Sequence, residues 1–391
     1  MTKTIITLNE VKRNNLRSVL DLLLRSDGLS RIEIAARLGC DNTTVSRAVR
    51  ELIDRGIIGT GSKNGSSSGR PRVALQVSAD GPLLLGIAWE ADGVTGVLTD
   101  LKSSPRRTES IRFSHRPDRQ EYLAAVTDVV GRLRRAAPRE PAGIGVTVFG
   151  SYFGTDAVLE KVAALSMLDG LKLRPFLTDC TGSDVIICDH SVAVAAFLTR
   201  MEPALTVGDV MLITVGKGLG VVLLHNGHRI FSRGNHGGEF GHTIRIPGGE
   251  TCACGRQGCL ETLVSTSALL GKYRCLTGEE IALETLGGKF EAGKKTADEV
   301  ILPATEMLGT AIAEQLNNYP VDKLVVSGDI LKLGSRFRQT LRRCIASSLF
   351  SLAKEDLQFF FPQSDSTDAL AVGASMLAAE NYVANFSPQT D

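Results

Sequence analysis

The chain has 391 residues, of which 43% are hydrophobic and 22% are charged, and a chain of this length is expected to form two or three domains. No run of about 18 apolar residues occurs, and the N-terminus Met1–Thr4 lacks the apolar core of a signal peptide, so we expect a cytoplasmic protein without membrane insertion. Three of the eight cysteines cluster and five are single, a pattern expected for a metal site and free thiols, not for a disulfide framework.

The formal net charge of +1 conceals two oppositely charged regions. Residues 1–72 hold 13 Lys and Arg against 7 Asp and Glu, a net charge of +6. The remaining residues hold 31 against 36, a net charge of −5. A small basic module joined to a mildly acidic body predicts a polyanionic partner for the first region only.

Three short helices are predicted in the basic region. Ser30 and Glu33 form a capping box that begins the second helix. After a turn at 39–41, Asn42 is expected to cap the third helix, and Gly56 ends it. The helices are expected to bury apolar side chains at helical spacing: Leu16, Val19, Leu20, Leu23 and Leu24, then Ala35, Ala36 and Leu38, then Val45, Ala48, Val49, Leu52 and Ile53.

Two short helices joined by a turn of three or four residues describe a helix-turn-helix. The segments 57–58 and 73–75 are expected to pair as a small wing. DNA binding is the favoured function, and a three-helix bundle that binds a protein, or nothing, is the alternative. The outward face of the third helix carries side chains suited to base edges and phosphates: Asn42, Thr43, Thr44, Ser46, Arg47 and Arg50.

Residues 63–72 are poor in apolar side chains and are not expected to pack. In one interpretation they are a flexible tether. In the other, Arg70 and Arg72 enter a narrow minor groove of A·T-rich DNA. The two interpretations are compatible, and they give a first domain of residues 1–77.

Beyond residue 80, apolar strands alternate with amphipathic helices, which predicts an α/β fold. The strand pair at 210–224 repeats the opening pair at 83–100, so two α/β halves are expected. Asp189 follows a buried strand at the carboxyl edge of a sheet, where ligands bind; a simple helix N-cap is the alternative. The strands are expected at 83–88, 93–100, 143–148, 185–188, 210–215, 220–224 and 324–327, and the helices at 121–136, 300–318 and 369–379.

One histidine and three cysteines lie within eighteen residues, interleaved with glycines: His242, Cys252, Cys254 and Cys259. They form the ligand set of a closed tetrahedral zinc site with a structural role; buried free cysteines are the alternative. Glu239 and Glu261 bracket the ligands, and each ionised carboxylate can accept two hydroxyl hydrogens from a ligand rich in hydroxyl groups.

The motifs E-F-G-H at 239–242 and C-A-C-G-R-Q-G-C-L-E at 252–261 resemble the signature of the ROK family (repressors, open reading frames and sugar kinases), and Gly-Arg-Pro at 69–71 resembles its repressors. The resemblance extends from about residue 80 to the end. It implies an actin-like, hexokinase-type body of two lobes, residues 80–196 with a closing helix 369–385, and residues 197–368 with the zinc site. It also implies that Glu239, His242 and Glu261 contact a sugar, and it places Asp189 where the family's kinases have a general base.

The chain departs from the family's kinases at the nucleotide loops. Residues 88–93 read A-W-E-A-D-G, and Trp89 and Glu90 are expected to occupy the first phosphate turn and to disfavour ATP. In the second loop, Lys217 replaces a hydroxyl residue; it suits a phosphorylated sugar, or it is an ordinary surface lysine. Ser327-Gly328-Asp329 replaces a run of glycines at the adenosine end. No catalytic residue is therefore assigned.

The resulting hypothesis is a sugar-responsive transcriptional regulator, which family habit makes a repressor. It is expected to act as a homodimer or homotetramer on double-stranded operator DNA and to respond to a sugar or sugar phosphate. An ATP-dependent sugar kinase with an accessory DNA-binding module is the first alternative. Release of DNA through a protein partner is the second.

Overall fold

A computed structural model of the chain describes residues 8–26, 28–61, 73–160, 163–230, 237–350, 356–362 and 368–387. The chain divides into two compact units: Met1–Thr147 with Lys172–Ile187 and Ala371–Asp391, and Val148–Leu171 with Cys188–Leu370. The expected domain boundaries after residues 77, 196 and 368 stay predictions. So do the minor-groove contacts of Arg70 and Arg72, which lie outside the described residues. Within the described ranges, no helix combines the length and apolar character needed to cross a bilayer.

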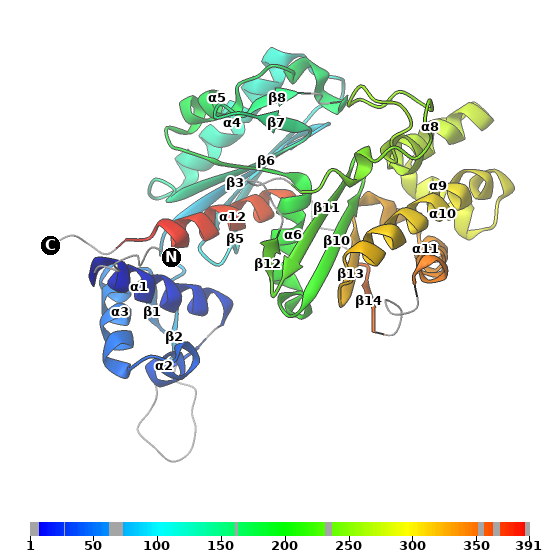
Figure 1. The fold of residues 1–391 in the computed structure, drawn as a ribbon. Coiled ribbons are helices and arrows are strands. Elements are labelled where there is room, and N and C mark those ends of the chain that lie inside the picture. Colours follow the sequence, from blue (N-terminus) through cyan, green and yellow to red (C-terminus); the bar gives the residue numbers. More distant parts are fainter. Residues whose placement is uncertain are drawn as a thin grey trace. The chain divides into compact units, whose positions relative to one another are not determined.

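The first unit begins with three helices and a two-stranded wing (Figure 1). They are α1 (Leu8–Arg25), α2 (Arg31–Leu38), α3 (Asn42–Asp54), β1 (Ile58–Thr60) and β2 (Leu75–Val77). The strands pair antiparallel, with Ile58 opposite Val77. The wing is therefore confirmed, although its second strand begins at Leu75 and not at Val73. Leu75 and Val77 face the core, whereas Val73 is 42% exposed.

Side-chain caps set the limits of α2 and α3. The predicted capping box is present at α2, where the Ser30 N–H donates to the Glu33 carboxylate over 2.8 Å. The prediction of Asn42 as the cap of α3 is wrong. Asp41 caps this helix, accepting from the N–H of Thr44 at 2.8 Å and from its hydroxyl at 2.6 Å. A carboxylate also interacts favourably with the positive end of the helix dipole, which an amide does not.

The apolar faces of the three helices pack into one cluster, as predicted. Leu24, Leu38 and Ile53 lie at its margin and are only partly buried. Ala36 was predicted to be buried but is exposed, and Ile34 takes the inward position. Burying isoleucine removes more apolar surface from water than burying alanine, so this orientation of α2 is favoured.

The first unit continues as a five-stranded sheet in the order β5-β4-β3-β6-β9. Its strands are β3 (Leu83–Glu90), β4 (Gly93–Asp100), β5 (Pro105–Arg112), β6 (Gly143–Val148) and β9 (Ile186–Asp189). β3, β4 and β5 are antiparallel neighbours, and β6 runs parallel to β3. The inner strands are apolar because both of their faces are covered. The sequence analysis missed β5, a largely exposed edge strand.

Three helices accompany this sheet: α4 (Arg119–Ala136), α5 (Leu173–Thr181) and α12 (Ala369–Asn385). The backbone of α12 lies directly on the sheet. A Cβ atom on Gly86 would be 1.8 Å from the carbonyl oxygen of Ala371, and one on Gly145 would be 1.9 Å from that of Ala374. Only glycine at these two strand positions permits such close packing of helix backbone on sheet.

The second unit contains a sheet in the order β12-β11-β10-β13-β14. Its strands are β10 (Asp209–Val215), β11 (Leu219–His225), β12 (His228–Ile230), β13 (Lys323–Ser327) and β14 (Gln358–Phe360). β10 pairs antiparallel with β11 and parallel with β13. The order repeats that of the first sheet, so the predicted duplication is confirmed.

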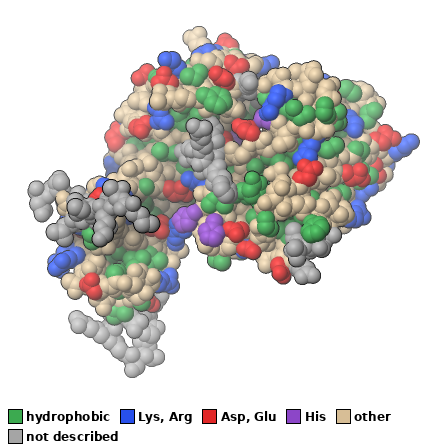
Figure 2. All heavy atoms as spheres, in the orientation of Figure 1, with side chains coloured by type: hydrophobic (Ala, Val, Ile, Leu, Met, Phe, Trp, Pro, Cys, Tyr) green, Lys and Arg blue, Asp and Glu red, His purple; other side chains and the backbone are tan. Residues whose placement is uncertain are grey.

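The remaining elements belong to the second unit. These elements are β7 (Ser151–Phe153), β8 (Val158–Glu160), the short 3-10 helices Ala163–Leu168, Pro203–Thr206, Phe240–His242 and Asp329–Leu333, and the helices α6 (His190–Met201), α7 (Glu261–Val264), α8 (Thr266–Thr277), α9 (Leu283–Glu291), α10 (Lys295–Asn318) and α11 (Ser335–Ser348). Over the visible face of the molecule, basic side chains are interspersed with acidic ones (Figure 2).

Candidate functional site

The four residues predicted to bind a metal converge in the second unit. One ligand atom from each of His242, Cys252, Cys254 and Cys259 lies within 4.8 Å of the others. The Sγ atoms of Cys254 and Cys259 are 3.6 Å apart, and Nδ1 of His242 is 3.5 Å from Sγ of Cys252. Tetrahedral bonds of about 2.3 Å to sulfur and about 2.0 Å to nitrogen would place ligand atoms at nearly these separations. The cluster therefore fits a metal ion.

A tight loop places the cysteines. The N–H of Cys252 donates to the carbonyl of Arg256 at 2.7 Å, and the N–H of Gly255 donates back to Cys252 at 2.9 Å. Gly258 has a φ of 72°, and a Cβ there would lie 1.6 Å from the carbonyl oxygen of Ile246. This loop consequently requires glycine at 258.

The three thiols of the cluster differ in pKa, which is lowered for Cys254 and raised by burial for Cys252 and Cys259. Burial acts to raise the pKa of Cys254. Hydrogen bonds to its sulfur, of which those from Arg256 contribute most, outweigh this effect and lower the pKa to about 6. Burial raises the pKa of Cys252 to about 12. Since a thiolate is the form that binds metal, Cys254 is ready to bind at neutral pH, whereas Cys252 must release a proton as the ion enters.

His242 joins this cluster to the candidate sugar-binding carboxylates. Its Nδ1 faces Cys252, while its Nε2 lies 3.7 Å from the carboxylate of Glu239. Glu261 begins α7, and its carboxylate accepts a hydrogen bond from the N–H of Leu219 at 3.2 Å. Burial raises the pKa of Glu261, and the positive charge of a protonated His242 opposes this rise. One histidine can thus bind a metal on one side and orient polar groups on the other.

Two glycines leave space beside Glu261. Cβ atoms on Gly218 and Gly241 would lie 3.2 Å and 3.3 Å from its Oε2. Gly218 belongs to the β10–β11 turn, in which Gly216 donates to the carbonyl of Gly218 at 2.9 Å. Lys217, at the tip of this turn, is exposed.

Asp189 lies at the end of β9 and caps α6. Its Oδ1 accepts from the N–H of Val192 at 2.8 Å, and its Oδ2 accepts from the N–H of Gly237. The N-cap alternative is thus correct as a description of its local structure. Gly237 lies two residues before Glu239, so Asp189 is linked through the backbone to the candidate sugar-binding segment.

The first predicted phosphate turn has a different structure from the one expected. Trp89 and Glu90 were predicted to occupy the turn, but both lie in β3, and the turn consists of Ala91 and Asp92. Trp89 is 1% exposed and packs against the rings of Tyr122 and Phe176, at centroid distances of 5.6 Å and 6.1 Å. Burial of the large indole ring accounts for the difference.

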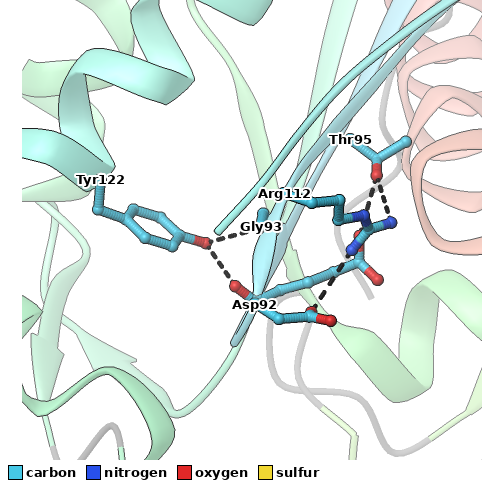
Figure 3. Close-up of polar contacts among 6 residues, drawn as sticks. Asp92, Gly93, Thr95, Arg112 and Tyr122 are labelled. Atoms are coloured by element: carbon cyan, nitrogen blue, oxygen red, sulfur yellow. Dashed lines mark hydrogen bonds and ion pairs between the residues drawn. The ribbon is translucent and has the colours of Figure 1, made fainter. Parts of the chain in front are cut away.

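Polar contacts fix this β3–β4 turn (Figure 3). Arg112 pairs with Glu90 at 2.9 Å and with Asp92 at 3.4 Å. It also donates to the hydroxyl of Thr95 at 3.1 Å. The hydroxyl of Tyr122 donates towards the carbonyls of Glu90 at 2.9 Å and of Gly93 at 3.2 Å. Side chains from β5 and α4 therefore close the β3–β4 turn.

The candidate DNA-contacting residues lie along α3. Asn42, Thr43, Arg47 and Arg50 are exposed, whereas Thr44 and Ser46 are half-buried. Thr44 is engaged with the cap Asp41. The arrangement matches the predicted outward face, and the individual contacts to bases stay predictions.

The sequence analysis did not identify three residues that shape these sites: Asp41, Arg112 and Gly237. Asp41 was detectable, because Asp is among the residues preferred at a helix N-cap. Arg112 lies on the missed edge strand. Gly237 acts through its backbone N–H, which leaves no signal in a single sequence.

Comparison with known proteins extends these observations. The xylose repressor of Caldicellulosiruptor bescii is 24% identical over 359 residues, 87% of this chain and 89% of the repressor. The DNA-binding transcriptional dual regulator NagC of Escherichia coli K12 is 24% identical over 381 residues, 93% of this chain and 92% of NagC.

Two solved structures show the same fold. A ROK family transcriptional regulator, a homolog of the E. coli MLC protein, matches with a TM-score of 0.79 and 23% identity over 95% of this chain and 97% of that one. A ROK family glucokinase from Streptomyces griseus, in complex with glucose and AMPPNP, matches with a TM-score of 0.65 and 19% identity over 76% of this chain and 99% of the kinase. The expected hexokinase-type α/β body is thereby confirmed.

Family models agree with both parts of this architecture. The winged helix-turn-helix DNA-binding model matches residues 12–58, which cover most of α1 and all of α2 and α3. The ROK family model matches residues 85–381, well over half of the sequence. The chain belongs to the ROK family.

Proposed function

We propose that this protein is a sugar-responsive, DNA-binding transcriptional regulator, and more specifically a repressor. The observation that carries the proposal is that one chain combines two features. The first is the exposed basic and polar face of α3, and the second is the pair of carboxylates, Glu239 and Glu261, beside the metal-ligand cluster. The names of its relatives, a xylose repressor and an N-acetylglucosamine repressor, support a carbohydrate effector. A DNA partner implies action in the cytoplasm.

The metal in this proposal is Zn²⁺, held by His242, Cys252, Cys254 and Cys259. Its contribution is structural, because four protein ligands complete a tetrahedral shell. The chain's own residues do the binding: Glu239 and Glu261 accept hydroxyl hydrogens, and Asp189 is proposed to accept a further one. Nε2 of His242, directed away from the cysteines, orients the Glu239 carboxylate.

Catalysis is not part of the proposal. The half-buried Glu90 and its partner Arg112 occupy the region where a kinase of this family has glycines. Near the third nucleotide segment, Asp329 pairs with Lys332 at 3.0 Å. Anionic side chains committed to ion pairs offer no N–H cradle to a triphosphate.

Regulation requires that the sugar bind the DNA-free arrangement better than the DNA-bound one, by roughly 1–3 kcal/mol in typical cases. A homodimer or homotetramer is proposed, because paired operator half-sites require at least two α3 helices. Because the two α3 helices must match the two half-sites, the effector is proposed to act by changing the spacing between these helices.

The proposal can be tested by a thermal-shift screen followed by DNA binding. The probes are xylose, N-acetylglucosamine and glucose, each free and phosphorylated, with DNA duplexes selected by the protein from a random library. A sugar at about 100 times its Kd should stabilise the protein by roughly 2.7 kcal/mol and should release the duplex. Glu261→Gln should lose the stabilisation, whereas the exposed α10 variant Glu306→Gln should keep it. Failure to select any duplex would contradict the proposal.

The sugar kinase is the second candidate, favoured by the structural match to the glucokinase. An assay of ADP release with the same free sugars separates it from the regulator. Turnover that disappears in Asp189→Ala would support the kinase. A duplex that no sugar releases, but that a cell extract releases, would direct attention to a protein partner.

A further inference from the structure

The C-terminal helix α12 contributes to the core of the DNA-binding head, which comprises α1 to α3 with β1 and β2. Four of its residues belong to the head's hydrophobic cluster: Ala378, Ala379, Val383 and Phe386, the last of these just beyond the helix end. Phe386 is 4% exposed. The head thus completes its core with residues that lie more than 300 positions away in the sequence.

Polar contacts hold the end of α12 to the head. Nε of Arg17, in α1, donates to the carbonyl of Phe386 at 3.1 Å. A guanidinium N–H of Arg55 donates to the carbonyl of Ser387 at 2.8 Å. The same guanidinium lies 4.0 Å from the centre of the Phe386 ring, a cation–π arrangement.

Arg55 is the residue that ends α3. It is the C-cap of this helix, and its side chain also pairs with Glu51 of α3 at 3.5 Å. Its side chain is only 23% exposed. Arg55 therefore connects the helix that carries the exposed basic face to the end of α12, and its guanidinium is committed to protein partners.

The other end of α12 is fixed to the sheet. The close backbone packing at Gly86 and Gly145 seats the helix on β3 and β6. Leu84 of β3 and Leu101, which follows β4, belong to the same hydrophobic cluster as the head. Within the first unit, packed groups therefore connect the sheet through α12 to Arg55 and α3. Figure 1 shows the C-terminal end of α12 close to α1.

We propose that Arg55 and Phe386 are positioning residues for DNA recognition. They fix the C-terminal end of α3 to α12, so that the orientation of the recognition face is set by the helix seated on β3 and β6. Neither residue needs to touch DNA. This inference rests on the proposed DNA-binding function and adds the residues through which the body holds the head in place.

Full-length variants with a duplex selected from a random library by the wild-type protein provide the test. Phe386→Ala and Arg55→Gln should each weaken specific binding on the order of tenfold, and the double variant should be little weaker than the worse single variant, because the two side chains act as one contact. The conservative Phe386→Tyr keeps the aromatic ring and should bind like the wild type. The matched control for charge is Arg25→Gln. This change removes an exposed arginine of the head that pairs, among the described acidic residues, only with Asp21.

Two readouts separate positioning from other roles. A misplaced α3 should lower the ratio of affinity for the selected duplex to affinity for a scrambled duplex, whereas simple loss of folded protein lowers both affinities equally. Phe386→Ala should leave the slope of log K against log salt unchanged. If Arg55 instead contacts a phosphate, Arg55→Gln alone should weaken binding and reduce that slope by about one.

The inference is overturned if Phe386→Ala binds the selected duplex with wild-type affinity and discrimination, or if it loses both duplexes in equal proportion. Circular dichroism of each variant establishes that the protein is folded. Inability of the wild-type protein to select any duplex would instead overturn the proposed function, and the two failures are therefore distinguishable.

Discussion

Each of the two sheets contains a corresponding antiparallel hairpin, β3–β4 in the first and β10–β11 in the second, but the turns of the two hairpins differ. In the second unit, the β10–β11 turn is glycine-rich, and its outgoing strand is tied to the carboxylate of Glu261. In the first unit, the β3–β4 turn is closed by Arg112 and by the hydroxyl of Tyr122. The duplicated topology thus carries one turn that leaves space beside an acidic group and one turn that is filled by its own side chains.

This difference indicates that binding capacity is controlled by the residues around a turn and not by the sheet that supports it. A glycine turn leaves the space beside it free of side-chain atoms, whereas an ion pair over a turn satisfies the local charges internally. One fold can therefore leave room for a ligand in one half and close the corresponding turn in the other.

The largest expected effect comes from removing the metal support beside the open turn. Cys254→Ser should lose the ion and weaken sugar binding at least 10–100-fold, because Glu239 and Glu261 would no longer be held in place. Metal analysis and isothermal titration with the sugar found in the thermal-shift screen provide the measurement. Cys275→Ser, which changes an exposed cysteine of α8, is the control. Unchanged sugar affinity in the metal-free Cys254→Ser protein would contradict the metal's supporting role.

Filling the open turn should have the next largest effect. Gly218→Val places a Cβ atom 3.2 Å from Oε2 of Glu261, closer than an ordinary van der Waals contact. We expect sugar affinity to fall about tenfold, a cost of roughly 1.4 kcal/mol. Gly271→Ala in α8, where a Cβ meets nothing within 4 Å, should bind normally. A Gly218→Val protein that binds the sugar as well as the wild type would show that the turn does not border the ligand.

Opening the closed turn should have a smaller effect, on stability alone. Arg112→Ala leaves Glu90 half-buried without its main cationic partner, at a cost on the order of 1 kcal/mol, since the arginine is itself 40% exposed. Arg107→Ala, which removes a more exposed arginine of the same strand, should cost less in urea unfolding. ATP turnover should not emerge in Arg112→Ala. Its emergence would show that the ion pair alone suppresses a kinase.

The smallest expected effect is a change in the pH dependence of stability. Burial raises the pKa of Glu90 above its ordinary value of 4.5, and Arg112 only partly offsets this rise. The folded protein therefore holds this proton more tightly than the unfolded chain, so the stability that it provides is present below about pH 4 and is lost as the pH rises through the raised pKa of Glu90. Glu90→Gln does not titrate. Its melting temperature relative to the wild type should increase over this pH range, and a constant difference would show that the burial of Glu90 has no net cost.

Much of the fold follows from the sequence because apolar spacing and caps act locally. The Ser30–Glu33 box and the strands at 83–100 and 210–224 were predicted within a few residues. β5 could not be predicted, because Pro105–Arg112 is charged and mostly exposed and is a strand only through its pairing with β4. The burial of the Ile34 side chain likewise depends on how the whole helices pack against one another.

The candidate site was predictable to the extent that its chemistry lies in one segment. His242 and the three cysteines are close in sequence, and their convergence follows from their spacing. The link from Gly237 to Asp189 joins residues 48 positions apart through a backbone N–H, and Arg55 reaches Ser387 across 332 positions. Such contacts are set by tertiary structure, and no pattern in a single sequence encodes them.

The exposed strand β5 has a consequence for assembly. Its arginines and Glu109 cover one border of the first sheet, and Arg106 and Arg107 are paired within the same unit. Strands from another molecule that docked there would have to displace or bury these charges, so intermolecular β-pairing along this border is disfavoured. Subunits that associate to bring two operator-reading heads together are therefore expected to meet through some other surface.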